Sequence, residues 1–277
     1  MHRILLLMAT RTYRARAFMR AARRLGAEVV VGTERKQAVA KPGATLTLNF
    51  RDPAHATAQI VEAARERPFD AIVGVDDDTV LIAAMAAAAL DIPHNDVEAV
   101  RATRNKHLMR RVLAAAGVPS PWFTLVRLDE DVTVAARHLR YPCVVKPTFL
   151  SGSRGVIRTD DEAEFVRAVE RVRAILAQPE VAAMGGEEAS HVLVEEYIPG
   201  AEAALEGILT GGELQVLALF DKPDPLDGPY FEETIYVTPA RLPPARQHAL
   251  IEVTAAAARA LGLREGPVHA EVRLNDQ

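Results

Sequence analysis

The sequence lacks several features that would place it in a common class of protein. Its single cysteine, Cys143, excludes a disulfide within the chain and fits a reducing compartment. Acidic residues outnumber basic ones by 37 to 33, so the net charge is −4 and there is no basic excess for nucleic acid. The first apolar run, Ile4 to Ala9, is too short for a signal peptide. The longest, Val80 to Leu90, is far shorter than the ~20 residues that span a bilayer. We therefore predict a cytoplasmic protein with no nucleic-acid and no membrane partner.

Lysine is also scarce, because arginine supplies most of the basic charge. Where arginine is the usual cation, a lysine can mark a place that needs a compact ammonium group; codon bias and chance are the alternative. The five lysines are Lys36, Lys41, Lys106, Lys146 and Lys222. Cys143 lies in an apolar run, and we interpret it as a buried core thiol rather than a reactive one. The length of 277 residues suits two or three lobes.

The first hundred residues alternate between strand and helix patterns. This rhythm predicts a small doubly wound parallel sheet. The expected strands cover 3–9, 28–32 and 69–75, and the expected helices cover 14–25, 54–67 and 79–90. The turn after the first strand lacks the Gly-x-Gly-x-x-Gly fingerprint, which argues against a dinucleotide. Asp76, Asp77 and Asp78 follow the third strand. They could hold a metal or a substrate amine, but we favour a polar turn that caps a helix.

The rest of the chain predicts an α/β arrangement after a boundary near Gly117. A helix over 100–116 ends at that glycine, and Pro119 and Pro121 prevent its return. We expect strands over 143–146, 191–195 and 268–274, helices over 162–176 and 248–261, a hairpin of 204–209 with 214–220 across Gly211-Gly212, and a mobile segment over 178–190.

Three segments of this half carry groups that could bind a phosphorylated ligand. Lys146-Pro147 closes a strand and is followed by Ser151-Gly152-Ser153-Arg154-Gly155, whose N–H, hydroxyl and guanidinium groups could bind an anion; an ordinary Ser/Gly hairpin turn is the alternative. In the segment 192–202, a strand at a sheet edge would offer backbone groups to adenine and Glu202 would face a ribose; a surface strand with solvated acids is the alternative.

The final strand alternates apolar and polar residues. Period two places His269, Glu271 and Arg273 on one face, opposite the apolar positions. A carboxylate beside two potential cations is typical of a wall that binds metal and phosphate. A solvent-exposed face with salt bridges is the alternative.

The order of these motifs resembles the ATP-grasp superfamily, and the resemblance covers nearly the whole chain. Three of the five lysines fall within the motifs of this family. The matching segments are Asn105-Lys106 with LAAAGVPSP at 113–121, VVKP at 144–147, SGSRGV at 151–156, VEEYIPGAE at 194–202, DKPDPLDGPYFEE at 221–233 and HAEVR at 269–273. The resemblance implies an α/β fold with a Rossmann-like preATP-grasp lobe over 1–100. A two-subdomain ATP-grasp fold would follow, with a small subdomain and linker helix over 101–196 and a C-terminal subdomain over 197–277.

The same resemblance implies a role for each matching residue, with ATP and Mg²⁺ as cofactors. Lys106, Lys146 and Lys222 would contact the phosphates, and Ser151, Gly152, Ser153, Arg154 and Gly155 would form a flap over them. Glu195, Glu196, Tyr197 and Ile198 would form a hinge that reads adenine mainly through its backbone, Glu202 would bind the ribose, and Glu271 would bind magnesium. The catalytic set would be Lys146, Arg154, Lys222 and Arg273.

One departure from the family pattern concerns the metal site. The family has a second metal segment, Glu-x-Asn, after the first acidic ligand, whereas this sequence stops at Gln277 and Asn275 is too close to Glu271. We expect either a fragment that ends within a β-hairpin, so that the last subdomain is incomplete, or a protein that lacks part of its metal site.

The implied activity is that of a ligase that activates a carboxylate as an acyl phosphate for attack by an amine. The long loop around Lys222 resembles the amino-acid ligase and carbamoyl-phosphate-synthase-like branches. The partners would be a small carboxylate and a small amine, and a homodimer is compatible with this reading. A non-catalytic nucleotide-binding protein and a transferase of another class are the alternatives. We predict that Lys146→Ala nearly abolishes turnover and leaves the fold intact, and that Lys106, Lys146, Glu202 and Glu271 share one cleft.

Overall fold

The structure, a computed structural model, describes residues 2–35 and 44–275, so Lys36 and Lys41 lie outside the described residues. Its internal contacts divide the chain into two units, residues 1–101 and 102–277, which are described separately here. None of the helices in the described ranges is both long and apolar enough to cross a membrane.

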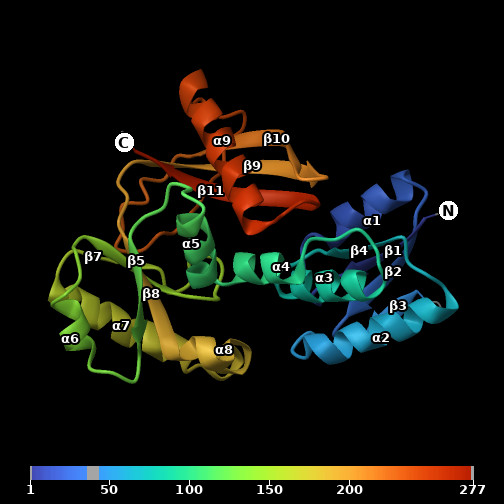
Figure 1. Ribbon diagram of the computed structural model, residues 1–277, viewed down its shortest axis with the longest axis horizontal. Helices are drawn as coiled ribbons and strands as arrows, with labels where there is room; N and C mark the ends of the chain where they lie inside the picture. Colours follow the sequence, from blue (N-terminus) through green and yellow to red (C-terminus); the bar gives the residue numbers. More distant parts are fainter. Residues whose placement is uncertain (1, 36–43, 276–277) are drawn as a thin grey trace. The chain divides into compact units, whose positions relative to one another are not determined.

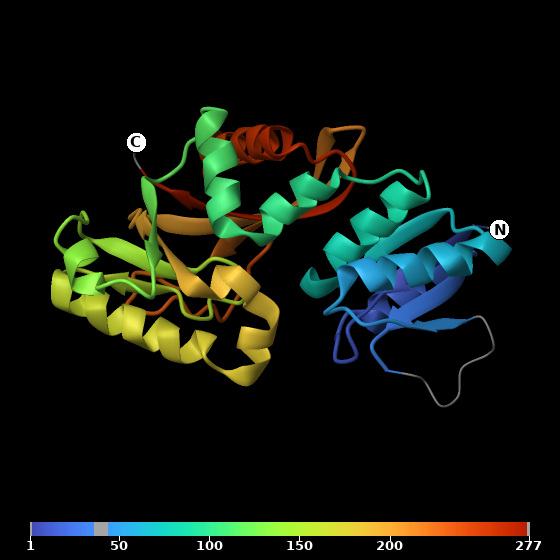
Figure 2. The same cartoon turned by 60° about the horizontal axis from the view of Figure 1, so that its bottom comes forward.

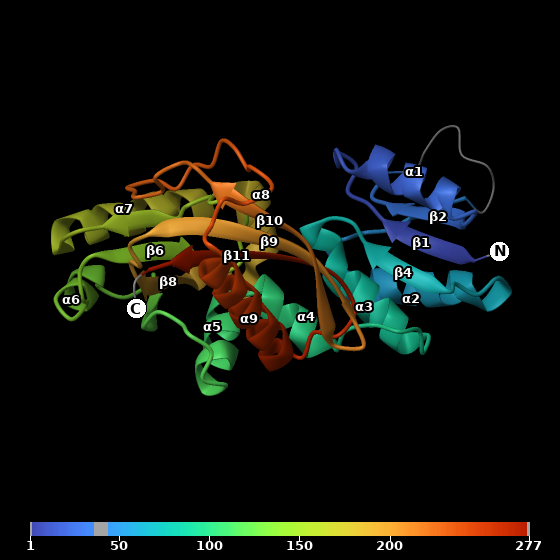
Figure 3. The ribbon, with the colours of Figure 1, turned by 90° about the horizontal axis from the view of Figure 1, so that it is seen from above.

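The first unit is a parallel sheet with helices on both faces. Its strands β1 (Arg3–Leu7), β2 (Glu28–Thr33), β3 (Thr45–Thr47) and β4 (Ala71–Gly74) lie in the order β3-β2-β1-β4. Helix α1 (Ala15–Arg24) covers one face, while α2 (Pro53–Glu66) and α3 (Val80–Ala89) cover the other (Figure 3). Alternate residues of β1 enter the two cores, Leu5 and Leu7 on the α2 side and Leu6 on the α1 side. The doubly wound parallel sheet confirms the prediction, but strand β3 was not predicted.

Asp76 lies two residues after the end of β4 and holds the turn that leads into α3. Its carboxylate accepts hydrogen bonds from Ala9 N at 3.0 Å and from Thr12 Oγ1 at 2.7 Å. It also forms a capping box with Thr79 at the short 3₁₀ helix η1 (Asp77–Thr79). The interpretation of this acidic run as a strand-end turn with a helix cap is therefore confirmed.

Two helices lie around the boundary between the units, where the sequence predicted one. Helix α4 (Val97–Arg104) ends before Asn105, and α5 (Lys106–Ala115) begins after it. The Asn105 side chain accepts a hydrogen bond from Leu108 N at 2.9 Å, and Lys106 N donates to the Thr148 carbonyl at 2.8 Å. The prediction of one helix over 100–116 is wrong, because a side-chain cap and a tertiary contact start a new helix inside it.

An antiparallel sheet in the order β5-β8-β6-β7 forms the first layer of this unit. It contains β5 (Phe123–Arg127), β6 (Cys143–Pro147), β7 (Ile157–Thr159) and β8 (His191–Glu196). Helices α6 (Val132–Ala136), α7 (Glu162–Leu176) and α8 (Pro179–Gly185) supply its core together with Cys143, which is 0% exposed. The prediction of a buried thiol is confirmed. Where the sequence predicted a mobile segment over 178–190, the chain forms α8 and η2 (Gly186–Ser190), and Val181 is buried.

A second antiparallel sheet, in the order β10-β9-β11, forms the other layer. Its strands are β9 (Ala201–Thr210), β10 (Glu213–Lys222) and β11 (Gly266–Leu274), and α9 (Pro244–Leu261) packs against one face. Figures 1 and 2 show α9 on this sheet and α7 against the β5-β8-β6-β7 sheet. Gly211 and Gly212 close the predicted β9–β10 hairpin with φ of +60° and +93°, values that glycine adopts readily.

Candidate active site

The face of the β10-β9-β11 sheet opposite α9 carries rows of ionisable side chains. Residues directly opposite each other on neighbouring antiparallel strands share a face, so the register defines these rows. The three rows are Lys222–Glu202–Arg273, Phe220–Ala204–Glu271 and Ala218–Glu206–His269. The predicted alternation of β11 is confirmed, and it brings Glu271 next to the row that holds Lys222.

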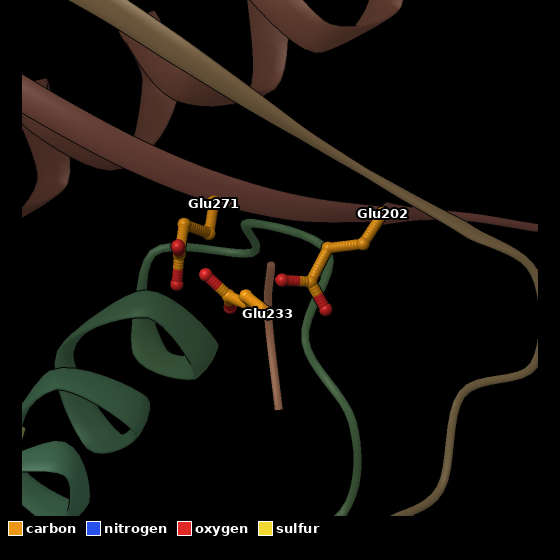
Figure 4. Close-up of side chains that lie close together, drawn as sticks. All are labelled: Glu202, Glu233 and Glu271. Atoms are coloured by element: carbon orange, nitrogen blue, oxygen red, sulfur yellow. The ribbon is translucent and has the colours of Figure 1, made fainter. Parts of the chain in front are cut away.

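Lys222 lies at the centre of three carboxylates that come from different segments. Its Nζ atom donates to Glu202 Oε1 at 2.6 Å, Glu233 Oε1 at 2.7 Å and Glu271 Oε1 at 2.5 Å. Figure 4 shows the three carboxylates pointing toward one another. Burial alone would lower the pKa of Lys222, but the hydrogen bonds to these carboxylates outweigh it and raise the pKa above its ordinary value. The ammonium group is therefore permanently charged and neutralises part of the cluster.

Two further side chains complete the hydrogen bonds of Glu271. The Tyr236 hydroxyl lies 2.8 Å from Glu271 Oε1 and 2.5 Å from Glu233 Oε2, and it donates its one hydrogen to one of these two carboxylates at a time. His269 lies between Glu271, at 3.5 Å, and Glu206, at 2.8 Å. Burial would raise the pKa of Glu271, but the contacts with His269, Lys222 and Tyr236 outweigh it and lower the pKa to about 2. The hydrogen bond to Glu271 is the main cause of the raised pKa of His269.

The motifs assigned no role to Glu233 or Tyr236, and the pattern of the final strand offered His269 only as a potential cation of the wall around Glu271. Glu233 and Tyr236 belong to the loop after β10, and only the acids and aromatics of that loop could have drawn attention to them. His269 was placed on the correct face by the period of the strand, but its partner Glu206 could be identified only from the register of β9 with β11.

The carboxylate cluster has the chemistry of a divalent-cation site. One oxygen from each of Glu202, Glu233 and Glu271 lies within 4.8 Å of the others. Carboxylate oxygens are the hard ligands that Mg²⁺ and Ca²⁺ prefer, so the donor set fits Mg²⁺. The Lys222 ammonium already contacts all three oxygens, so a cation bound here would share the carboxylates with it. Lys222, which was predicted to contact phosphates, thus has acidic neighbours at its tip.

Arg273 connects this cluster to the segment predicted as a hinge. Its Nη1 atom donates to the Ile198 carbonyl at 3.0 Å and its Nη2 atom to the Leu226 carbonyl at 2.6 Å. Its Nε atom lies 3.6 Å from Glu202 Oε2. Both terminal nitrogens of this predicted catalytic residue therefore hold backbone, and Arg273 ties Glu202 to the hinge.

The predicted hinge leaves an inner strand rather than a sheet edge. Strand β8 lies between β5 and β6, and Glu195 pairs with Val144 in the ladder. The N–H groups of Glu196 and Tyr197 donate to the carbonyls of residues 122 and 142 at 3.0 and 3.3 Å. The expectation of free backbone groups is therefore wrong for these three residues, because the sheet already uses them. The Ile198 N–H has no hydrogen-bond partner within residues 2–35 and 44–275.

Glu195 holds a second charged cluster on its side chain. The residue is 2% exposed. Its carboxylate accepts hydrogen bonds from Lys146 Nζ at 2.5 Å and from Arg110 Nε and Nη2 at 2.7 and 3.3 Å. Burial would raise the pKa of Glu195, but attraction to Lys146 and Arg110 outweighs it and lowers the pKa to about 2. The side chain of Glu195, which was predicted to belong to the adenine hinge, is the shared anion of two cations.

The predicted flap is the connection between β6 and β7. Gly152, Ser153 and Gly155 all have positive φ, at +64°, +52° and +78°, so the loop has the tight left-handed turns that its glycines allow. Arg154 donates to Gln178 and lies 3.9 Å from Glu180, so this predicted catalytic residue contacts the start of α8. Ser151 is exposed.

The two charged clusters lie at opposite ends of the segment 195–198. Glu195 carries the Lys146 cluster, and Ile198 is bonded to Arg273, which lies next to Glu202 in the Lys222 cluster. Lys106 Nζ donates to the Leu150 carbonyl, on the loop that follows Lys146. The contacts thus connect the predicted residues into one chain of neighbours.

The prediction of one shared cleft stays a prediction, and two hollows of the described structure lie in the first unit. One, of about 380 Å³, is lined by Thr10, Glu34 and neighbouring residues of the first unit, and another, of about 410 Å³, is lined by Glu34, Asn49 and His55 among others. Neither includes a residue that the sequence analysis assigned to the nucleotide.

Comparison with known proteins gives two family matches. Residues 139–277 match the ATP-grasp domain, and residues 19–94 match the ATP-grasp N-terminal domain. The solved structure of an L-amino acid ligase from Bacillus licheniformis superposes with a TM-score of 0.80 and 26% identity, over 100% of this chain and 64% of that one. These matches confirm the fold class expected from the resemblance.

The curated relatives of this chain include a ligase and a synthase. The chain is 29% identical over 227 residues to an alanine–anticapsin ligase of Bacillus amyloliquefaciens. The matched segment covers 78% of this chain and 48% of that protein. It is 32% identical over 182 residues to dapdiamide A synthase of Enterobacter agglomerans, covering 65% of this chain and 41% of that protein. The chain spans about half the length of the curated relatives that it matches.

Proposed function

Because this chain belongs to the ATP-grasp family, we propose that it is an ATP-dependent carbon–nitrogen ligase that joins a small carboxylate to a small amine. The γ-phosphoryl group of ATP would pass to a carboxylate oxygen, which yields ADP and an acyl phosphate. The amine nitrogen would then bond to the acyl carbon, the bond from that carbon to the phosphate oxygen would break, and the nitrogen would lose a proton. The relatives named above are ligases and a synthase, and two are named for amino acids, so amino acids are the proposed substrate class.

The nucleotide would be held by the residues that connect the two clusters. We assign Lys106 and Lys146 to the phosphates, the Ile198 N–H to the adenine edge, and Glu202 to the ribose or to the metal. The loop Ser151 to Gly155 would close over the phosphates. The partial exposure of the Lys146 side chain, 21%, supports this assignment, because its ammonium keeps donors that Glu195 does not use.

The carboxylates of Glu202, Glu233 and Glu271 would hold Mg²⁺. The bound ion would neutralise part of the phosphate charge. Within the chain itself, Lys222 would offset the charge of this wall, and Arg273 would keep Glu202 at a fixed place beside the hinge. The protein would therefore act mainly by positioning the reacting groups and stabilising charge.

Several attributes of the ligase remain proposals of the same kind. We propose the division into residues 1–100, 101–196 and 197–277, a cytoplasmic location where ATP and free amino acids are available, and small molecules as the partners. Arg154 would act on the phosphates after moving from its contact with Gln178.

One observation carries the proposal beyond family membership. The Lys222 ammonium, with its side chain 1% exposed, is bonded to carboxylates from β9, β11 and the loop after β10. Stability alone is a weak reason to bury such a cluster, because a buried ionic group is often no better than an apolar one. A site that must bind both a cation and an anionic nucleotide gives this arrangement a use.

The experiment is an isotope-transfer assay on this chain with ATP, Mg²⁺ and pairs of amino acids, one labelled with ¹⁸O in its carboxylate. The proposal expects ADP release that depends on substrate and transfer of one ¹⁸O to inorganic phosphate. Formation of AMP, or ADP release without label in the phosphate, would refute the acyl phosphate. Binding of ATP without substrate-dependent ADP release would identify a nucleotide-binding protein, and absence of ATP binding would indicate another class of enzyme.

A further inference from the structure

Arg110 has no role in the function proposed so far, yet it contacts a residue at its centre. Strand β8 alternates, with Val192 and Val194 in the core beside α7, so Glu195 points to the opposite face. Arg110, on α5, meets it there with a two-point contact, from Nε to Oε1 at 2.7 Å and from Nη2 to Oε2 at 3.3 Å. A two-point contact orients the carboxylate as well as neutralising it.

This contact decides which oxygen remains for Lys146. Arg110 Nε occupies Glu195 Oε1, and Lys146 Nζ binds Oε2 at 2.5 Å. Lys146 lies opposite residue 193 in the β6–β8 register, so its contact with Glu195 is a diagonal one across the strands. An ammonium group has three donors, and within the described residues Glu195 is the one partner of Lys146. The other two donors are thus directed by a carboxylate that Arg110 holds in place.

The charges of the three residues show why a second cation matters. Lys146 and Glu195 alone sum to zero, and a neutral pair offers little attraction to a triphosphate. With Arg110 the sum is two positive charges and one negative, a net charge of +1, in a place where the Glu195 side chain is only 3% exposed. Charge interactions in such surroundings are screened much less than at the surface.

We propose that Arg110 is a positioning residue for nucleotide binding: it takes up the charge of Glu195, so that Lys146 presents a fixed ammonium group with net positive charge to the phosphates. Arg110 acts through Glu195 and Lys146. The proposal rests on the function proposed above, since it assumes that Lys146 meets the phosphates of ATP.

The test is calorimetric binding of ATP-Mg to the whole chain, at low and at high salt, for a set of charge variants. Arg110→Met leaves a neutral pair and is expected to weaken binding at least tenfold, with a smaller loss at high salt. The double variant Arg110→Met/Glu195→Gln restores the net charge of +1 and is expected to bind within about threefold of the wild type. Arg110→Lys keeps the charge and is expected to recover most of the affinity. Arg111→Met is the matched control, because Arg111 is the next residue of α5 and is exposed.

The outcomes separate this inference from the proposed function. Absence of ATP binding by the wild type refutes the proposed function. Binding by the wild type and equally by Arg110→Met refutes the role of Arg110. A double variant no better than Arg110→Met also refutes it, because restoring the net charge would then not restore binding. If Arg110→Met does not fold, as thermal unfolding would show, the double variant decides alone, and wild-type affinity is then the required result.

Discussion

Replacing Lys222 by methionine tests the structure most directly, because it removes the one ammonium shared by three carboxylates. Two unit charges 4.8 Å apart repel by about 3.5 kcal/mol at an effective dielectric constant of ~20, and by about 1 kcal/mol in water. The Glu202, Glu233 and Glu271 side chains are 15%, 22% and 41% exposed, so solvent screens Glu271 most.

We therefore expect Lys222→Met to lower the free energy of unfolding by about 2–4 kcal/mol near pH 8, somewhat less than removal of one partner of a fully buried pair. For a unit of this size, that loss corresponds to a decrease in Tm of roughly 4–16 °C. Thermal unfolding followed by circular dichroism measures it. Arg241→Met is a suitable control, because Arg241 is exposed and its hydrogen bond to Asp221 uses the backbone N–H.

The loss of stability in Lys222→Met should depend on pH, in a direction that follows from the pKa values of the carboxylates. In the wild type, the pKa of Glu271 lies at about 2 instead of 4.5, so its contribution to stability is present above about pH 4.5 and is lost toward pH 2. In Lys222→Met the depressing contact is gone and repulsion raises the carboxylate pKa values. As the pH falls from about 8 to 5, the variant takes up a proton and its deficit relative to the wild type shrinks. Millimolar Mn²⁺ without nucleotide is expected to raise the Tm of the variant more than that of the wild type.

Two results would refute this reasoning. The first is a Tm for Lys222→Met within about 1 °C of the wild type near pH 8, where the expected loss is several degrees. The second is a deficit that does not change between about pH 8 and pH 5, because that would mean that packing rather than charge causes it.

Three other changes have expected outcomes. Lys146→Ala should lower turnover roughly a hundred- to a thousand-fold, which corresponds to about 2.7–4 kcal/mol of activation barrier. Because this change also leaves Glu195 with one cation, we expect a lower Tm as well. An unchanged Tm would contradict this. Cys143 is 0% exposed and burial raises its pKa, so it should react with a disulfide reagent only after denaturation; rapid labelling of the native protein would disprove the burial. Gly200→Ala should cost about 2 kcal/mol or more in a urea titration, because φ is +113° and the new Cβ would lie 2.1 Å from the Leu274 carbonyl oxygen. A wild-type midpoint would show that the chain can adjust there.

Long periodic segments were predictable from the sequence because their signals are local. Helix α7 has the predicted bounds, and β11 alternates as its sequence indicates. Three short strands were not predicted, although β1, β4 and β6, which are also short, were. Strands β3, β5 and β7 are three to five residues long, and each exists because a neighbouring strand supplies its hydrogen bonds. The break at Asn105 likewise depends on Thr148, which is distant in the chain.

The residues of the candidate site were largely predictable, but their partners were not. Motif order singled out Lys146, Glu195, Lys222 and Glu271, all of which lie in the two charged clusters. The ion pairs among them were not predictable, because a motif shows which ionisable groups exist and not which of them neutralise each other. Arg110 had no motif signal, and its importance depends on the face of α5 that meets β8.

By itself, the sequence determined the family, the order of the elements and the kinds of charged group available, since these follow from motifs and from periodicities of two and 3.6 residues. Only the tertiary structure decided that Lys222 is enclosed by three carboxylates and that Glu195 is shared by two cations. The physical reason is that ion pairs form between groups a few ångströms apart, whereas the pairing register and helix packing that bring them together join segments far apart in the chain.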